Sequence, residues 1–99
     1  MDKKQRQREF AHLVDRQMNL RHQLEHIEEK LNVYEQLQLQ RAKYGTNSLY
    51  RLDIKRKVVD DFLNGDWQQT IELYKRVFHE SYVIERRICE LTNNHRDFY

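Results

Sequence analysis

Residues 10–38 read FAHLVDRQMNLRHQLEHIEEKLNVYEQLQ, and apolar side chains recur through this stretch at alternating intervals of three and four residues. The recurring positions, of which only the two glutamines are polar, are Phe10, Leu13, Gln17, Leu20, Leu24, Ile27, Leu31, Tyr34 and Gln38. This is the a and d spacing of a heptad repeat, which keeps one edge of an α-helix facing a partner helix. We therefore expect a first helix from about residue 3 to 44, ended by Gly45.

The C-terminal third of the chain repeats this spacing. Its stripe consists of Trp67, Thr70, Tyr74, Val77, Ser81, Ile84, Ile88, Leu91, His95 and Phe98. The pattern predicts a second long helix over about 67–96, which follows the helix-ending pair Asn64-Gly65. Asp66 is expected to cap this helix in a capping box with Gln69. Trp67 is expected to pack onto the preceding helix.

A shorter helix is predicted between the two long ones, from about residue 48 to 64. Thr46, Asn47 and Ser48 offer side chains that cap a helix N-terminus. The apolar side of this helix consists of Leu49, Leu52, Ile54, Val58, Val59, Phe62 and Leu63. The expected fold class is therefore all-α, with a long, a short and a long helix in a single domain of residues 1–99.

The composition agrees with a helical fold and excludes several others. Charged residues make up 34% of the 99 residues and hydrophobic residues 38%, with no Pro and two Gly. No apolar run approaches the roughly 20 residues that cross a bilayer, so we expect no membrane-spanning helix. A β-sandwich or barrel needs turn residues about every 8–12 positions, and these are missing.

The predicted helix lengths suggest self-association. The last helix spans roughly 45 Å and the first roughly 60 Å, so Phe10, Leu13 and Leu20 would be bare in a single chain. We therefore predict a side-by-side or intertwined homodimer with coiled-coil-like antiparallel packing, and a monomeric antiparallel hairpin is the alternative. The residues predicted for this dimer and core seam are Phe10, Leu13, Leu20, Leu24, Ile27, Leu31, Tyr34, Tyr74, Val77, Ile84, Ile88 and Leu91.

Two basic segments stand out although the formal net charge is only +2. The N-terminal basic segment consists of Lys3, Lys4, Arg6 and Arg8. The middle basic segment consists of Arg51, Lys55, Arg56 and Lys57. Cations gathered on one face can neutralise phosphates, so these eight residues are the candidate nucleic-acid contacts.

One short motif is typical of metal-dependent hydrolysis. His22, Glu25 and His26 match the H-x-x-E-H string in which two histidines hold zinc and the glutamate acts as a base. In the heptad frame both histidines point away from the seam, where a third ligand and a walled cavity are missing. We therefore expect no catalytic residues, no metal and no cofactor.

A helix-turn-helix is one arrangement in which the chain would bind DNA. In that interpretation a recognition helix would start at Ser81 and present Arg86 and Arg87 to a groove. The heptad phase continues through His79 and Glu80 without a break, which favours one uninterrupted helix instead.

The long–short–long order of helices resembles the all-helical chorismate mutases, which are intertwined dimers whose pockets clamp a dicarboxylate with Arg and Lys. The matching positions are Lys43, the D-x-x-R of Asp53 to Arg56, and the polar pair Ser81 and Glu85. The resemblance implies a helical enzyme. The chain departs from the family pattern at Lys57 and Asn32, and at the apolar seam residues Leu24, Ile27 and Leu31.

These observations favour a non-enzymatic helical interaction or regulatory protein that binds a macromolecular partner, most simply another protein. By general analogy such proteins include accessory and inhibitor proteins of phages and mobile elements. A nucleic-acid-binding regulator is the alternative, and no membrane or small-molecule substrate is expected. Cys89 has no second cysteine to pair with and no signal-peptide stretch is evident, so we expect a cytoplasmic setting, in a cell or an infected host.

Overall fold

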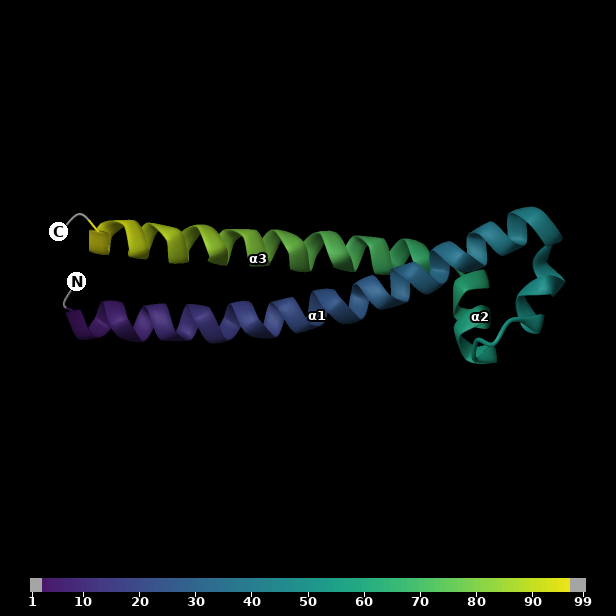
Figure 1. Ribbon diagram of the computed structural model, residues 1–99, viewed down its shortest axis with the longest axis horizontal. Coiled ribbons are helices and arrows are strands. Elements are labelled where there is room, and N and C mark those ends of the chain that lie inside the picture. Colours follow the sequence, from purple (N-terminus) through teal and green to yellow (C-terminus); the bar gives the residue numbers. More distant parts are fainter. Residues whose placement is uncertain (1–2, 97–99) are drawn as a thin grey trace. The chain divides into compact units, whose positions relative to one another are not determined.

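The computed structural model of the chain describes residues 3–96, and the side chains of residues 3–92. Helix α1 spans Lys3–Tyr44, the 3-10 helix η1 spans Thr46–Arg51, α2 spans Arg56–Leu63 and α3 spans Asp66–Arg96 (Figure 1). Residues 3–96 contain no β-strand, so the expected all-α class is confirmed. The predicted stripe positions His95 and Phe98 lie outside the described side chains.

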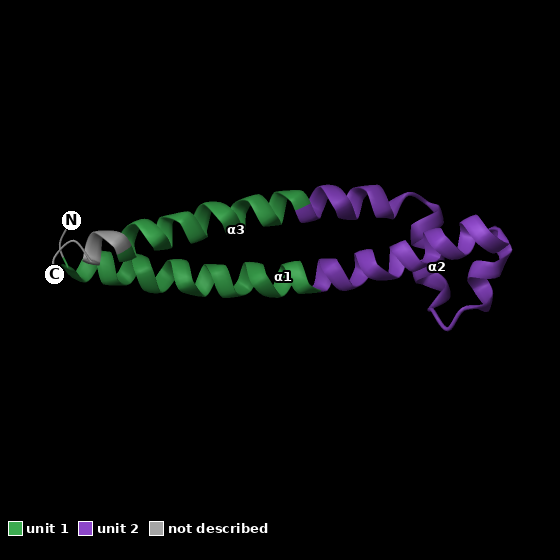
Figure 2. Ribbon diagram, turned by 45° about the horizontal axis from the view of Figure 1, so that its top comes forward, with its two compact units in different colours: residues 1–25, 75–99 green, residues 26–74 purple. Residues whose placement is uncertain are grey.

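The chain divides into two compact units (Figure 2). Unit 1 contains residues 1–25 and 75–99, and unit 2 contains residues 26–74. Each unit therefore contains one part of α1 and one part of α3, and η1 and α2 belong entirely to unit 2.

In unit 1 the segments of α1 and α3 lie side by side and run in opposite directions. Arg87 Nε donates to Glu9 Oε1 at 2.8 Å, and Arg16 Nε donates to Glu80 Oε1 at 3.1 Å. In these pairs the residue number on α3 decreases as the residue number on α1 increases, so the two segments are antiparallel. The side chains buried in this unit are Leu20, Val77, Ser81 and Leu91.

The expectation that Phe10, Leu13 and Leu20 are bare in a single chain is wrong for Leu13 and Leu20 and right for Phe10. Leu20 is only 1% exposed and Leu13 is half-buried, while Phe10 remains 41% exposed. The physical reason is where α3 begins. Asp66 lies beside Tyr34 rather than beside the end of α1, so the length of α3 is available to cover the earlier turns of α1.

The glutamine at the centre of this stripe is enclosed. Gln17 Oε1 is buried and has no hydrogen-bond partner within the described part of the chain. An unpaired buried amide oxygen costs about 1–3 kcal/mol, so Gln17 weakens the apolar seam that surrounds it.

Unit 2 has its own core, in which η1 and α2 close over the last turns of α1. The core consists of Tyr34, Leu37, Leu49, Val59 and Phe62. The ring centroids of Tyr34 and Phe62 are 5.5 Å apart, and those of Phe62 and Trp67 are 6.0 Å apart. Trp67 therefore packs onto α2, as the sequence predicted.

The single middle helix predicted over about 48–64 is wrong in its first half. The chain forms η1, leaves helical geometry between Leu52 and Lys55, and becomes helical again only at Arg56. In one continuous helix Leu49 would share its face with Asp53, Arg56 and Asp60, at intervals of four, seven and eleven residues. Breaking the helix lets Leu49 join the apolar core without burying those charges.

Asp66 connects the start of α3 to α1. Its Oδ2 lies 2.6 Å from Lys30 Nζ and accepts hydrogen bonds from Tyr34 Oη at 2.6 Å and Thr70 Oγ1 at 3.3 Å. The hydrogen bond from Lys30, followed by that from Tyr34, holds the pKa of Asp66 below its ordinary value. Burial and the hydrogen bond to Asp66 raise the pKa of Tyr34. Within the described residues this carboxylate is thus held by side chains of α1 and by Thr70, rather than in the predicted capping box with Gln69.

Asp66→Asn is expected to lower the free energy of unfolding at pH 7 by about 2 kcal/mol, because a charge-assisted hydrogen-bond cluster is lost. The folded pKa of Asp66 is lower than the ordinary 3.8, so its contribution is fully present above that value and disappears as the pH falls through the folded pKa. Urea unfolding at pH 7 and at pH 2.5 measures both effects. Asp53→Asn, an exposed control, should change stability by less than about 0.5 kcal/mol. Equal destabilisation by Asp66→Asn at both pH values would contradict this role.

Candidate binding surface

The junction of η1 and α2 holds four basic residues on the surface of unit 2. Arg51 ends η1, Lys55 precedes α2, and Arg56 and Lys57 form its first positions. All four side chains are exposed. We call these four residues the η1–α2 basic surface.

Tyr50 holds the two sides of this surface together. Its hydroxyl donates to Asp60 Oδ1 at 2.9 Å, and the guanidinium carbon of Arg56 lies 5.7 Å from its ring centroid. The hydrogen bond to Asp60 is the main cause that raises the pKa of Tyr50. Tyr50, Ile54 and Arg56 line a shallow open hollow here. No pattern in the sequence pairs Tyr50 with Asp60, because the two residues lie on separate helices of different type.

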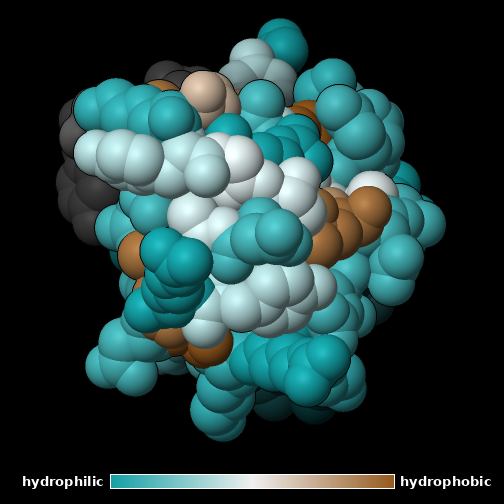
Figure 3. Space-filling model, turned by 90° about the vertical axis from the view of Figure 1, so that its right-hand side faces the viewer, coloured by the Kyte–Doolittle hydropathy of each residue, from teal (hydrophilic) through white to brown (hydrophobic). Residues whose placement is uncertain are grey.

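The segment around this surface has a strong charge imbalance. Residues 41–57 contain six Lys and Arg and one acidic residue, Asp53. Within the described part of the chain, the side chains of Arg51, Lys55 and Lys57 form no ion pair. Figure 3 shows the face to which η1 and α2 contribute: hydrophilic residues cover most of it, and hydrophobic ones appear only in small separate areas.

Arg41 has a structural role beside this surface. Its guanidinium carbon lies 5.0 Å from the ring centroid of Phe62, and its Nη2 donates to Gln38 Oε1 at 2.5 Å. These contacts anchor Arg41 on the core of unit 2, whereas Lys43 in the last turn of α1 is exposed.

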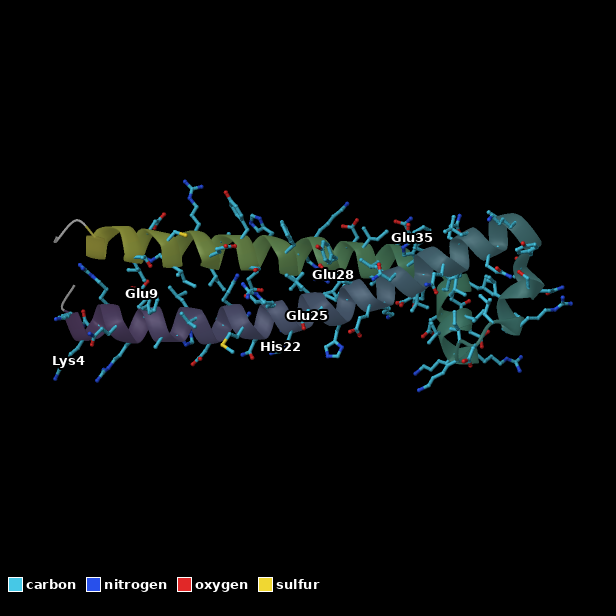
Figure 4. The ribbon with its side chains drawn as sticks, viewed as in Figure 1. Lys4, Glu9, His22, Glu25, Glu28 and Glu35 are labelled. Carbon is cyan, nitrogen blue, oxygen red and sulfur yellow. The ribbon has the colours of Figure 1, made fainter. Side chains whose placement is uncertain are left out.

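The N-terminal basic segment belongs to unit 1 and has a different setting. Lys3, Lys4 and Arg8 are exposed on the first turns of α1, and Lys4 points away from α3 (Figure 4). Arg6 is half-buried and lines an open apolar hollow whose other walls are Gln7, Phe10, Leu91 and Thr92. The two basic segments therefore lie in different units.

The three residues of the H-x-x-E-H motif are exposed. His22 and Glu25 belong to unit 1, and His26 belongs to unit 2. His22 Nδ1 is 3.7 Å from Glu25 Oε2, and both side chains are well exposed. Figure 4 shows His22 on the side of α1 away from α3, whereas Glu9 faces α3. Among the described residues, no three His, Cys, Asp or Glu side chains group as metal ligands.

The residues predicted for the seam occupy three kinds of environment. The buried ones are Leu20, Ile27, Tyr34, Val77 and Leu91. The half-buried ones are Leu13, Leu24, Leu31, Tyr74, Ile84 and Ile88, and Phe10 is exposed. Tyr74 also donates a hydrogen bond to Glu28 Oε1 at 3.3 Å within unit 2. The stripe thus forms contacts within one chain.

The helix-turn-helix residues belong to unit 1, and the positions that resemble chorismate mutases are divided between the two units. Helix α3 continues unbroken through His79 and Glu80, so the turn of a helix-turn-helix is not formed there. Ser81 and Glu85, the polar pair that resembles chorismate mutases, both belong to unit 1. Ser81 is buried there, whereas Glu85 is exposed. The other positions that resemble chorismate mutases belong to unit 2, namely Lys43, Asp53 and Arg56.

No protein-family model, curated protein or solved structure matches this chain. Within residues 3–96, none of the helices has the length and apolar character that crossing a membrane requires.

Proposed function

We propose that this chain is a non-enzymatic interaction protein that binds nucleic-acid phosphates through the η1–α2 basic surface. The observation that supports the proposal is the exposure of Arg51, Lys55 and Lys57 without an ion pair in the described part of the chain, in a segment with one acidic residue. Cations that are not neutralised internally are available to neutralise phosphates and release their counterions.

The scaffold under these cations supports the same proposal. Tyr50 connects η1 to α2 through Asp60 and Arg56, so the basic side chains extend from an ordered junction. An ordered surface loses less conformational entropy on binding than a flexible tail. The ring of Tyr50 is exposed beside the cations and offers a base a stacking surface, so we expect single strands to bind at least as well as duplexes.

We further infer that the α1 and α3 stripes pack as an antiparallel coiled coil within one chain. The burial of Leu20, Val77 and Leu91 in unit 1 and the antiparallel ion pairs beside them support this packing. A homodimer remains part of the proposal, and we place its contacts on a surface other than this stripe.

Fluorescence anisotropy with a labelled 20-nucleotide single strand and a 20-base-pair duplex tests the nucleic-acid proposal. About three to four neutralised phosphates predict a slope of log K against log salt of about −3. The triple variant Arg51→Gln, Lys55→Gln, Lys57→Gln should lower affinity at 50 mM salt at least tenfold and reduce the slope to between zero and about −1, because Arg56 remains.

The matched control carries the same charge change in the N-terminal basic segment: Lys3→Gln, Lys4→Gln and Arg8→Gln. It should bind within about threefold of the unchanged chain, because these residues lie outside the η1–α2 basic surface. Absence of binding to either probe at 50 mM salt would overturn the proposal. Equal losses in the two triple variants would overturn it as well, since net charge and not this surface would then explain the affinity.

A further inference from the structure

Helix α3 has a second apolar face in addition to the one that packs on α1. Val77 and Ser81 are buried against α1 in unit 1, while Phe78 is 53% and Tyr82 54% exposed. Phe78 and Tyr82 are four residues apart, so their side chains are neighbours on the helix surface. Two adjacent, half-exposed aromatic rings on one helix face are typical of an association surface.

The charges that flank these rings define the pattern of the face. Lys75, Phe78, Tyr82 and Glu85 follow one another at intervals of three, four and three residues, all within unit 1. This spacing keeps all four on one face of the helix, and Lys75 and Glu85 are both exposed. We call these four residues the outer α3 face. In either direction along the helix, it presents a charge, two rings and the opposite charge.

We propose that the outer α3 face binds the same face of a second copy of this chain, antiparallel and about a two-fold axis near residue 80. In this register Phe78 lies opposite Tyr82 of the second copy, and Lys75 lies opposite Glu85 of the second copy. The interface is self-complementary, as a two-fold interface must be. This inference rests on the proposed function of the chain as an interaction protein, and it assigns the surface through which the proposed homodimer forms.

Charge complementarity favours a second copy of this chain as the binding partner, with its α3 antiparallel to the first. A parallel, in-register copy would place Lys75 against Lys75 and Glu85 against Glu85, which is repulsive at both ends. An antiparallel copy forms two Lys–Glu pairs around four packed rings. The face is short compared with a standard interface of about 1,600 Å², so we expect a dissociation constant of roughly 10–100 µM.

Sedimentation between 5 and 500 µM should show a concentration-dependent change from the 12.4 kDa chain to twice that mass. Phe78→Glu should weaken self-association at least tenfold. Val83→Glu is the matched control: Val83 is 51% exposed, but lies about 100° around the helix from Tyr82, so association should be unchanged. Far-UV circular dichroism checks that both variants remain helical.

A charge swap tests the register without removing a ring. Lys75→Glu and Glu85→Lys should each weaken association severalfold. The double variant should restore it, because the two exchanged positions would again place opposite charges across the interface. A chain that stays monomeric at 500 µM, or a double variant weaker than both single ones, would overturn the inference. Nucleic-acid binding by a monomeric chain would leave the nucleic-acid part of the proposed function standing, and dimerisation without such binding would contradict that part alone.

Discussion

Leu20→Asp is expected to abolish the helical packing of unit 1. Leu20 is 1% exposed between the antiparallel segments of α1 and α3. Gln17 lies one turn away on α1, and its Oε1 has no hydrogen-bond partner among the described residues. A carboxylate in place of Leu20 would lose its hydration without gaining a cation or a donor, and the cost of more than about 4 kcal/mol is comparable to the whole stability of a small domain.

Far-UV circular dichroism measures the result at 25 °C as a loss of the helical signal that unit 1 contributes and of its cooperative thermal transition. Met18→Asp is the matched control, because Met18 lies two residues away on the same helix and is 56% exposed. That variant should keep the signal and the transition. A folded Leu20→Asp variant with unchanged unfolding would show that this part of the stripe is not enclosed within the chain.

Phe62→Ala is expected to cost about 4 kcal/mol, with the damage concentrated in unit 2. Phe62 lies at the centre of that core, where it contacts the rings of Tyr34 and Trp67 and the guanidinium of Arg41. Its loss removes the side chain through which α2 packs against Tyr34 of α1 and against Trp67. The ordered junction that presents the η1–α2 basic surface should loosen, and affinity for a nucleic-acid strand should fall with it.

Trp67 is the only tryptophan of the chain, so its fluorescence during urea unfolding reports on this core directly. In Phe62→Ala the midpoint should fall strongly and the native emission should move to longer wavelength as water reaches the indole. Leu39→Ala, an exposed change in the same unit, should shift neither quantity measurably. An unchanged midpoint in Phe62→Ala would contradict the contacts assigned to this ring.

The stripes of the two long helices were predictable because heptad spacing has one physical consequence. Leu20 and Ile27 lie on one edge of α1 and Val77 on one edge of α3, and each is buried whichever helix covers its edge. The same spacing carries no information on whether the covering helix belongs to the same chain. The prediction of a bare N-terminal stripe failed for Leu13 and Leu20, because α3 begins beside Tyr34 and its length covers the earlier turns of α1.

In the middle of the chain, tertiary packing rather than helical spacing decides which residues are buried. Leu37 is fully buried although Gln38 occupies the predicted stripe, because η1 and α2 cover the last turns of α1 from another side. The break between η1 and α2 does have a signal in the sequence. A continuous helix would have placed the charges of Asp53, Arg56 and Asp60 on the same face as Leu49. The contact of Tyr50 with Asp60 had no such signal, because it spans two helices of different type.

The pairing of α1 with α3 of the same chain is tested most directly by the concentration dependence of unfolding in the Phe78→Glu variant, which lacks the proposed dimer contact. Thermal unfolding by circular dichroism at 2 µM and 200 µM should give full helical signal and the same midpoint within about 1 °C. If the stripes instead pair between exchanged chains, folding is coupled to association, and the hundredfold change in concentration should raise the midpoint by about 7 °C.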